Sequence, residues 1–207
     1  MDFQILFYIL GIVLLAYIIG SFPTGYLLVK AVKGIDIRKE GSGSTGATNV
    51  KRILGTWAFF TVMAIDVLKG ALPVLASKYL EQKFNIYANI SILPVLVSIG
   101  VIVGHSRSIF LNFTGGKSVA SGVGTIFGLC WPVGLLTGII WSLITYTTKI
   151  VSIGSIIALL LTPVWMFVFH QPISYILYCL IGGIYITFYL HRANIKRLIA
   201  GNESKVR

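Results

Sequence analysis

Charged residues are scarce in this chain, and acidic residues are the scarcest. Only 11% of its 207 residues are Asp, Glu, Lys or Arg, and six of these are acidic. About 25% is usual for a soluble domain. With 56% hydrophobic residues and a mean hydropathy of +0.89, the composition excludes an ordinary soluble domain. No polar stretch is long enough for a second domain, so we expect one membrane-embedded domain over residues 1–207.

Cysteine is scarce as well. Cys130 and Cys179 both lie inside apolar stretches, which is typical of residues that pack in a core. No Cys, His and carboxylate residues cluster with the spacing of a metal site. We therefore expect no metal and no other cofactor.

Long apolar runs make up most of the chain, and a helix of ~20 apolar residues crosses a bilayer. The pattern predicts an all-α, polytopic membrane helix bundle with about seven transmembrane helices; five or six are the alternatives. The run at 118–148 is too long for one span and short for two. Trp131-Pro132 indicates a reversal in its middle, because proline disfavours helix in the preceding residue. The expected spans are 4–28, 53–79, 88–104, 118–131, 132–148, 151–169 and 172–190.

The net charge of +11 comes from basic residues that gather in short loops beside these runs. That placement favours anionic lipid or substrate as the partner, and no nucleic acid. Most of the 17 basic residues fall on one side of a seven-span chain. By the positive-inside rule that side is cytoplasmic, which puts the N-terminus outside and the C-terminus inside. The first run lacks a basic flank and a cleavage site, so we expect a retained span and not a signal peptide.

The most informative polar segment is GSGSTGATNVKR, from Gly41 to Arg52. Its small residues let successive backbone N–H groups converge on an anion, and Lys39, Lys51 and Arg52 supply positive charge. It is not a nucleotide-binding P-loop, because Ala47 stands where that motif requires lysine. We interpret it as an anion-binding loop at the edge of the bilayer. A flexible basic loop lying on anionic lipid is the alternative.

Three further polar segments fall on the same predicted side, so the four loops are expected to build one basic site. They are Gly104-His105 with Thr114 to Ser118, then Lys149 to Ser152, and then His191 to Arg197. Each histidine ends a predicted span and is a candidate general base or anion ligand, with a simple polar cap as the alternative.

Asp66 and Lys69 lie three residues apart inside a span, hence on one helix face. Ionisable residues at membrane depth usually face a cavity or each other. The pair is expected to fix helix packing, to support the site, or to do both.

Four segments together resemble a known family, the bacterial acyl-phosphate:glycerol-3-phosphate acyltransferases, or PlsY family. The first loop with Arg52 is similar to its GSGNxGATNxxR signature, and Asp66 to Gly70 to its DxxKG. Gly104 to Lys117 resembles GHxxxxFLxFxGGK, and His191 to Glu203 resembles HRxNIxRLxxGxE. This chain departs from the family's pattern at Ser44, Ser118, Ser121 and Lys149.

The resemblance implies transfer of a fatty acyl group from acyl phosphate to the 1-hydroxyl of glycerol 3-phosphate, as the first acylation of phospholipid biosynthesis. It implies a multi-pass protein of the bacterial cytoplasmic membrane with its site on the cytoplasmic side. The partners would be acyl phosphate, glycerol 3-phosphate and membrane lipid, and the enzyme that produces acyl phosphate is a candidate partner. Candidate catalytic residues are Ser42, Arg52, His105, Lys117 and His191. Candidate substrate- and phosphate-binding residues are Gly41, Gly43, Ser44, Thr48, Asn49, Gly115, Gly116, Ser152 and Asn194, with Asp66 and Lys69 in support.

Other catalytic classes fit the sequence less well. No serine stands in a G-x-S-x-G turn, which favours direct attack by the substrate hydroxyl, with His105, His191 or a phosphate oxygen of the donor as base. The HxxxxD pair of acyl-CoA-dependent enzymes is missing, because each histidine has a non-acidic residue five positions later. A phosphate transporter would have two related halves and ionisable groups near mid-membrane, and only Asp66 and Lys69 qualify.

Overall fold

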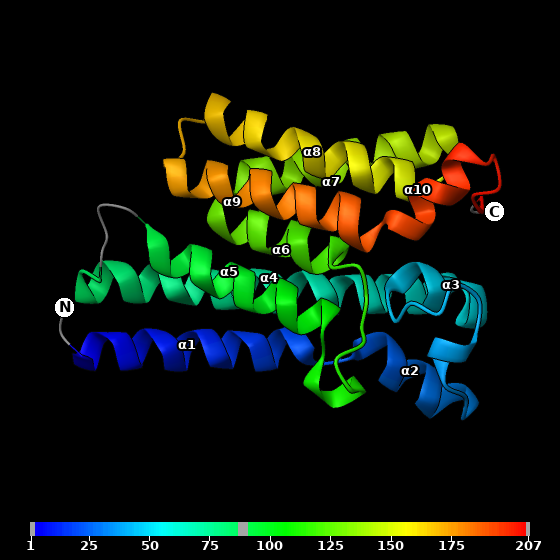
Figure 1. Ribbon diagram of the computed structural model, residues 1–207, viewed down its shortest axis with the longest axis horizontal. Helices are drawn as coiled ribbons and strands as arrows, with labels where there is room; N and C mark the ends of the chain where they lie inside the picture. The colour runs from blue at the N-terminus through cyan, green and yellow to red at the C-terminus, as the bar shows by residue number, and fades with distance from the viewer. Residues whose placement is uncertain (1–2, 87–90, 206–207) are drawn as a thin grey trace.

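The chain forms a bundle of helices that run nearly along its longest axis (Figure 1). The computed structural model describes residues 3–86 and 91–205. Its helices are α1 (Phe3–Ser21), α2 (Thr24–Lys33), η1 (Ile37–Lys39), α3 (Ala47–Leu54), α4 (Thr56–Phe84), α5 (Ile92–Ser106), η2 (Ile109–Leu111), α6 (Val119–Leu129), α7 (Trp131–Thr148), α8 (Val151–Val168), α9 (Ile173–Ile184), the π-helix η3 (Tyr185–Leu190) and α10 (Arg192–Ile199).

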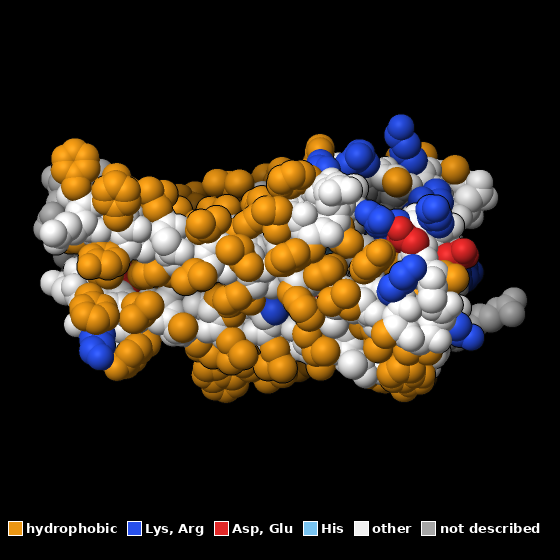
Figure 2. Space-filling view, turned by 90° about the horizontal axis from the view of Figure 1, so that it is seen from below, with side chains coloured by type: hydrophobic (Ala, Val, Ile, Leu, Met, Phe, Trp, Pro, Cys, Tyr) orange, Lys and Arg blue, Asp and Glu red, His pale blue; other side chains and the backbone are white. Residues whose placement is uncertain are grey.

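The protein is an all-helical membrane bundle, as predicted. Within the described residues, four helical segments are long and apolar enough to cross a bilayer, and α5 and α6 are shorter apolar helices. In Figure 2 hydrophobic side chains cover most of one face along the bundle, while most Lys and Arg side chains gather at one end. The four segments are Phe3–Lys33, Thr56–Phe84, Val151–Val168 and Ile173–Leu190.

The predicted span 4–28 is wrong in one respect, because the helix breaks at Phe22-Pro23. Proline has no N–H to donate, so a helical hydrogen bond is lost there. Phe22's carbonyl instead accepts from Lys69 Nζ at 2.9 Å. As a result α2 starts anew at Thr24 and carries Lys30 and Lys33 in its last turn.

Other boundaries shift by a few residues. The predicted span 53–79 begins later, at Thr56, and continues to Phe84. The predicted span 88–104 begins in residues outside the described part, and α5 extends beyond it to Ser106. The reversal predicted at Trp131-Pro132 is confirmed: α6 ends at Leu129 and Pro132 lies in the first turn of α7.

The helices α4 and α6 pack backbone against backbone. A Cβ on Gly124 would lie 2.1 Å from the Val67 carbonyl oxygen, and one on Gly70 would lie 2.3 Å from that of Ser121. Such contacts between small residues are a common way to pack helices in membranes. α6 also packs against α7, so it lies between α4 and α7 (Figure 1). The short helices α2, α3 and α10 lie with the C-terminus at one end of the bundle (Figure 1).

Candidate active site

One cavity of about 1180 Å³ opens among the loops at the α3 and α10 end and continues between α4, α6 and α7. The four polar loops therefore do converge, although they are far apart in sequence. All five candidate catalytic residues line this cavity: Ser42, Arg52, His105, Lys117 and His191. It is also lined by Gly41, Ser44, Thr48, Asn49, Asp66, Ser152 and Asn194.

Asn49 holds the first loop in shape. Its side chain is 1% exposed and donates to the carbonyls of Glu40 and Ser44, both at 3.0 Å. Its Oδ1 accepts from the Ser42 N–H at 3.0 Å. Gly41 passes directly over this amide with φ +57°, and a Cβ there would lie 2.3 Å from Asn49 Oδ1. The Asn49 side chain also lines the cavity, and its substrate-binding role stays a prediction beside this bonding within the loop.

The N-terminus of α3 is directed at the cavity. Gly46, Ala47 and Thr48, which begin this helix, all line it, and Arg52 lines it about one turn further on. The first N–H groups of a helix have no partner within it and carry a partial positive charge. An anion in the cavity would be attracted by this helix end and by the Arg52 guanidinium together.

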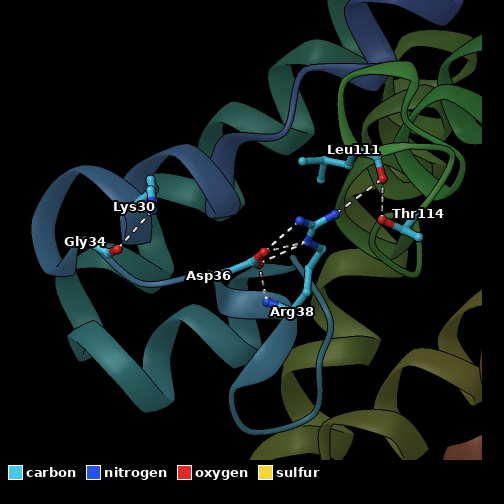
Figure 3. A network of polar contacts seen from close by, with 6 residues as sticks. All are labelled: Lys30, Gly34, Asp36, Arg38, Leu111 and Thr114. Carbon is cyan, nitrogen blue, oxygen red and sulfur yellow. Dashed lines mark hydrogen bonds and ion pairs between the residues drawn. The ribbon is translucent and has the colours of Figure 1, made fainter.

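Arg38 joins η1, just before the first loop, to η2, as Figure 3 shows. Its guanidinium is 2.6 Å from Asp36 Oδ2, and its Nη1 donates to the Leu111 carbonyl at 3.5 Å. Thr114 Oγ1 donates to the same carbonyl at 2.6 Å. Hydrogen bonds from Arg38 lower the pKa of Asp36 to about 2, so the pair stays ionised at neutral pH.

His105 is enclosed by the second loop and by an ion pair. Lys69 Nζ is 2.8 Å from Asp66 Oδ1, and this oxygen lies 4.0 Å from His105 Nδ1. On the other side, a Cβ on Gly116 would lie 2.1 Å from His105 Nε2, so only glycine fits there. The Gly116 N–H donates to the His105 carbonyl at 3.1 Å. This N–H therefore has a partner within the protein, and phosphate binding by Gly115 and Gly116 stays a prediction.

Glu203 gathers three side chains from two parts of the fold. It accepts from Ser152 at 2.9 Å, from Asn194 Nδ2 at 2.5 Å and from Arg197 Nε at 2.6 Å. Asn194 Oδ1 in turn accepts from Lys117 Nζ at 2.5 Å. Ser152 and Asn194, predicted to bind substrate, thus serve as links that fix Lys117 and Arg197 at the cavity.

The charges in this cluster shift one another's pKa. The pKa of Lys117 is lowered to about 8. Burial is the main cause, Arg197 and Arg52 add to it, and Glu203 acts in the opposite direction. Burial acts to raise the pKa of Glu203, but hydrogen bonds from Arg197, Asn194 and Ser152 bring it below its usual value. At neutral pH the cavity therefore holds a carboxylate surrounded by cations.

His191 follows η3 and has a defined tautomer. Its Nδ1 lies 2.9 Å from the Ile186 carbonyl, which can only accept, so Nδ1 carries the proton and Nε2 has a free lone pair. The pKa of His191 is lowered to about 4. Burial is the main cause and Lys117 adds to it, while the Ile186 hydrogen bond and Glu203 act in the opposite direction. The imidazole is neutral at pH 7, as a general base requires.

Several predicted residues lie outside this cavity. Gly43, Gly115, Gly116 and Lys69 are not among its lining residues. Lys149 and Arg192, which belong to polar segments expected to build the basic site, are exposed beside aromatic rings. Sequence reasoning did not select Arg197 and Glu203, which do line it. A signal was available for Glu203, because it is the only acidic residue after Glu81. Within residues 3–86 and 91–205, no three His, Cys, Asp or Glu side chains group as metal ligands.

Beyond the charged end, the cavity is apolar. It continues along Phe59, Met63 and Val67 of α4, Val123 and Phe127 of α6, and Leu135 and Ile139 of α7. A site with a basic end and an apolar extension is suited to an amphiphile with an anionic head.

Comparisons with known proteins agree with this arrangement. Residues 10–201 match the model of the glycerol-3-phosphate acyltransferase family. The glycerol-3-phosphate acyltransferase of Trichormus variabilis is 44% identical over 95% of this chain and 91% of its own length, and that of Acaryochloris marina is 43% identical over 94% and 91%.

The fold agrees too. A crystal structure of PlsY (YgiH), an integral membrane glycerol 3-phosphate acyltransferase, in its glycerol 3-phosphate form has a TM-score of 0.88 and 32% identity to this chain. The match covers 97% of this chain and 96% of that one, and the lysophosphatidic acid form of the same protein has a TM-score of 0.86. The chain therefore belongs to the glycerol-3-phosphate acyltransferases of the PlsY family and is an integral membrane acyltransferase.

Proposed function

We propose that this acyltransferase moves a fatty acyl group from acyl phosphate to the 1-hydroxyl of glycerol 3-phosphate, giving lysophosphatidic acid and inorganic phosphate. One observation carries the proposal: a single cavity joins several cationic groups to an apolar channel between helices. The donor has a phosphate head and an alkyl chain, and the acceptor has a second phosphate. Lys117, Arg52 and Arg197 line one end of this cavity and match both phosphates.

Electrostatics explain why so many cations are needed. Two phosphates must come close enough for acyl transfer, and their repulsion is strong where water is excluded. Arg52, the N-terminus of α3 and Lys117 offset it together, and the charge that develops on the leaving phosphate is stabilised by the same groups. Ser42 and Thr48, which line the cavity beside them, would orient a phosphate or the hydroxyl.

The transfer needs no acyl-enzyme. The 1-hydroxyl oxygen attacks the acyl carbonyl carbon and forms the new C–O bond, while the bond from that carbon to the phosphate oxygen breaks. The electron pair leaves with phosphate, and the hydroxyl proton passes to a base. His191 Nε2 is favoured as that base by its tautomer and lowered pKa, with His105 and a phosphate oxygen of the donor as alternatives.

We also propose that seven helical spans cross the bacterial cytoplasmic membrane, with the N-terminus outside and the site inside. The basic loops support this orientation, because they lie together at the α3 and α10 end. The spans are α1, α4, α5, α6, α7, α8 and α9 with η3. The test uses Asn202→Cys in a variant whose Cys130 and Cys179 are both replaced by alanine. An impermeant thiol reagent should label it in inverted inner-membrane vesicles and not in right-side-out ones. Labelling in intact spheroplasts would contradict the orientation.

The reaction is tested with purified protein in detergent. Palmitoyl phosphate and labelled glycerol 3-phosphate should give labelled lysophosphatidic acid and one phosphate per turnover. Palmitoyl-CoA and palmitoyl acyl carrier protein, offered in place of acyl phosphate, should give none. Transfer from palmitoyl-CoA alone would overturn the choice of donor.

The residue roles are tested in the same assay. Ser42→Ala and Arg52→Ala should abolish turnover without changing elution or melting temperature. Lys33→Ala is a matched control for lost charge, because Lys33 is exposed at the same end of the bundle but does not line the cavity. Near-normal turnover of Arg52→Ala would remove the proposed phosphate site.

A further inference from the structure

The apolar part of the cavity is built from three helical stripes. Phe59, Met63 and Val67 recur every four residues on α4, as do Val119, Val123 and Phe127 on α6. Residues with this spacing share one helix face. The third stripe, on α7, comprises Leu135, Gly138, Ile139 and Ser142. From Val119 to Phe127 the floor formed by α6 is about 12 Å long, and it starts beside Lys117.

This groove is open along its side. Phe127 is 38% exposed, Leu135 is 50% exposed and Ile139 is 46% exposed, although all three line it. In a bilayer these surfaces face the acyl chains of lipid. An alkyl chain can therefore enter sideways, while its charged head is held at the basic end of the same cavity.

Gly138 stands out among the glycines of α6 and α7. A Cβ on Gly124, Gly128 or Gly134 would lie within 3 Å of a neighbouring helix, so these glycines are needed for packing. A Cβ on Gly138 would have nothing within 4 Å, yet Gly138 lines the groove. Helix packing therefore does not require glycine here, and the missing side chain adds depth to the groove.

We infer that Gly138 is a specificity-determining residue: it keeps the groove deep enough for the long acyl chain of the donor. This inference rests on the proposed function only in naming acyl phosphate as the donor. The occupant is the acyl chain itself, because the groove is continuous with the cationic end that suits the head of the same molecule. A side chain at position 138 would fill space that the chain uses beyond its first few carbons.

A series of substitutions of increasing size tests the inference. Gly138→Ala, Gly138→Val and Gly138→Phe are assayed with hexanoyl, decanoyl and palmitoyl phosphate at saturating glycerol 3-phosphate. We expect kcat/KM for palmitoyl phosphate to fall progressively, by about tenfold or more with Phe, since small changes in an apolar pocket alter kcat/KM this much. For hexanoyl phosphate the change should stay within twofold.

Gly11→Phe is the matched control. Gly11 also has nothing within 4 Å of an added Cβ, but it lies on the exposed face of α1 and does not line the cavity. This variant should keep the wild-type preference for chain length. Gly138→Ala adds a single methyl group, so the trend can be read even if the Phe variant fails to fold.

The outcomes separate the inference from the proposed function. If wild-type protein uses only acyl-CoA, the donor assignment fails, and the same chain-length series made with acyl-CoA still tests Gly138. If the Gly138 variants lose activity equally with hexanoyl and palmitoyl donors, or keep full activity with both, the inference is wrong. A selective loss with the long donor supports it.

Discussion

Two segments that line the cavity, 41–49 and 191–203, are held in different ways. The loop at 41–49 is fixed by uncharged hydrogen bonds from one amide, Asn49, to partners no more than 12 residues away. The segment 191–203 is fixed by one carboxylate, Glu203, whose partner Ser152 lies 51 residues away. Lys117 is linked to this segment through Asn194, which lies 77 residues later in the chain.

The difference separates shape from charge. An amide has no titration in the physiological range, so the first loop should keep its form over a wide span of pH. The second cluster contains Lys117, with a pKa lowered to about 8, beside an ionised Glu203. Under the proposed function, the first segment sets the shape of the anion site, and the second sets how anion binding depends on pH.

Among the changes that test this contrast, the largest effect is expected from Asn49→Ala. It removes the partner of the Ser42 N–H and of the carbonyls of Glu40 and Ser44, and a hydrogen bond of this kind contributes about 0.5–1.5 kcal/mol. We expect the loop to lose its shape and kcat/KM to fall by about 100-fold or more. Steady-state assays in detergent, with the melting temperature recorded for each sample, measure this.

Asn49→Asp and Asn202→Ala make the Asn49 test specific. Asp keeps the acceptor for the Ser42 N–H but cannot donate to the carbonyls. The fall in kcat/KM for Asn49→Asp should therefore be close to that for Asn49→Ala. Asn202 is exposed near the same end of the bundle, and its loss should leave kcat/KM unchanged. If Asn49→Ala keeps more than half of the wild-type activity, uncharged hydrogen bonds do not fix this loop.

The next effect concerns pH. Burial lowers the pKa of Lys117 from its ordinary 10.5 to about 8, so Lys117 is charged below pH 8 and neutral above it. A phosphate monoester is already a dianion above its second pKa, which is about 6. We therefore expect kcat/KM for glycerol 3-phosphate to fall as pH rises through about 8, by roughly tenfold one unit above it.

The fall of kcat/KM at high pH is called the alkaline limb of the pH profile. Glu203→Gln should move this alkaline limb to lower pH. Glu203 raises the pKa of Lys117, so removing its charge lets that pKa fall further. Glu81→Gln makes the same change at the other buried glutamate, whose Oε1 accepts from the Leu93 N–H at 3.0 Å far along α4. It should leave the limb in place. Identical limbs for wild type and Glu203→Gln would contradict the coupling of Glu203 to Lys117.

Sequence patterns predicted most of the helices and the loops of the site, because those features are local. Apolar runs predict helices, and a cluster of glycine and hydroxyl residues predicts a polar loop, whatever the tertiary fold. The hydrogen-bond partners of individual residues inside the loops could not be predicted. Asn49 and Gly116 bond to their own loops, and no spacing in the sequence reveals that.

Long-range partners were the other gap. The helix break at Pro23 depends on Lys69, 47 residues later than Phe22, which supplies a donor to the freed carbonyl. The link from Ser152 to Glu203 likewise joins α8 to the tail after α10. Such pairings follow from how the helices pack, and a single sequence shows the residues but not which of them meet.

The smallest effect is expected at Arg38, which joins η1 to η2 through one long hydrogen bond. Arg38→Lys loses the planar fork that reaches Asp36 and the Leu111 carbonyl together. Ion pairs that are partly exposed contribute little, so KM for glycerol 3-phosphate should rise only about two- to fivefold, with kcat unchanged. Initial rates over a range of glycerol 3-phosphate concentrations give both constants.

The Arg38 variant also sharpens the contrast between shape and charge. Because the pKa of Asp36 is about 2, its pair with Arg38 does not titrate between pH 6 and 9, and Arg38→Lys should leave the alkaline limb where it is in wild type. Lys30→Ala is the matched control, since Lys30 Nζ reaches only the Gly34 carbonyl, at 3.0 Å in the same region (Figure 3). A shifted alkaline limb in Arg38→Lys would mean that Arg38 also affects the pKa of Lys117, which is assigned here to Glu203.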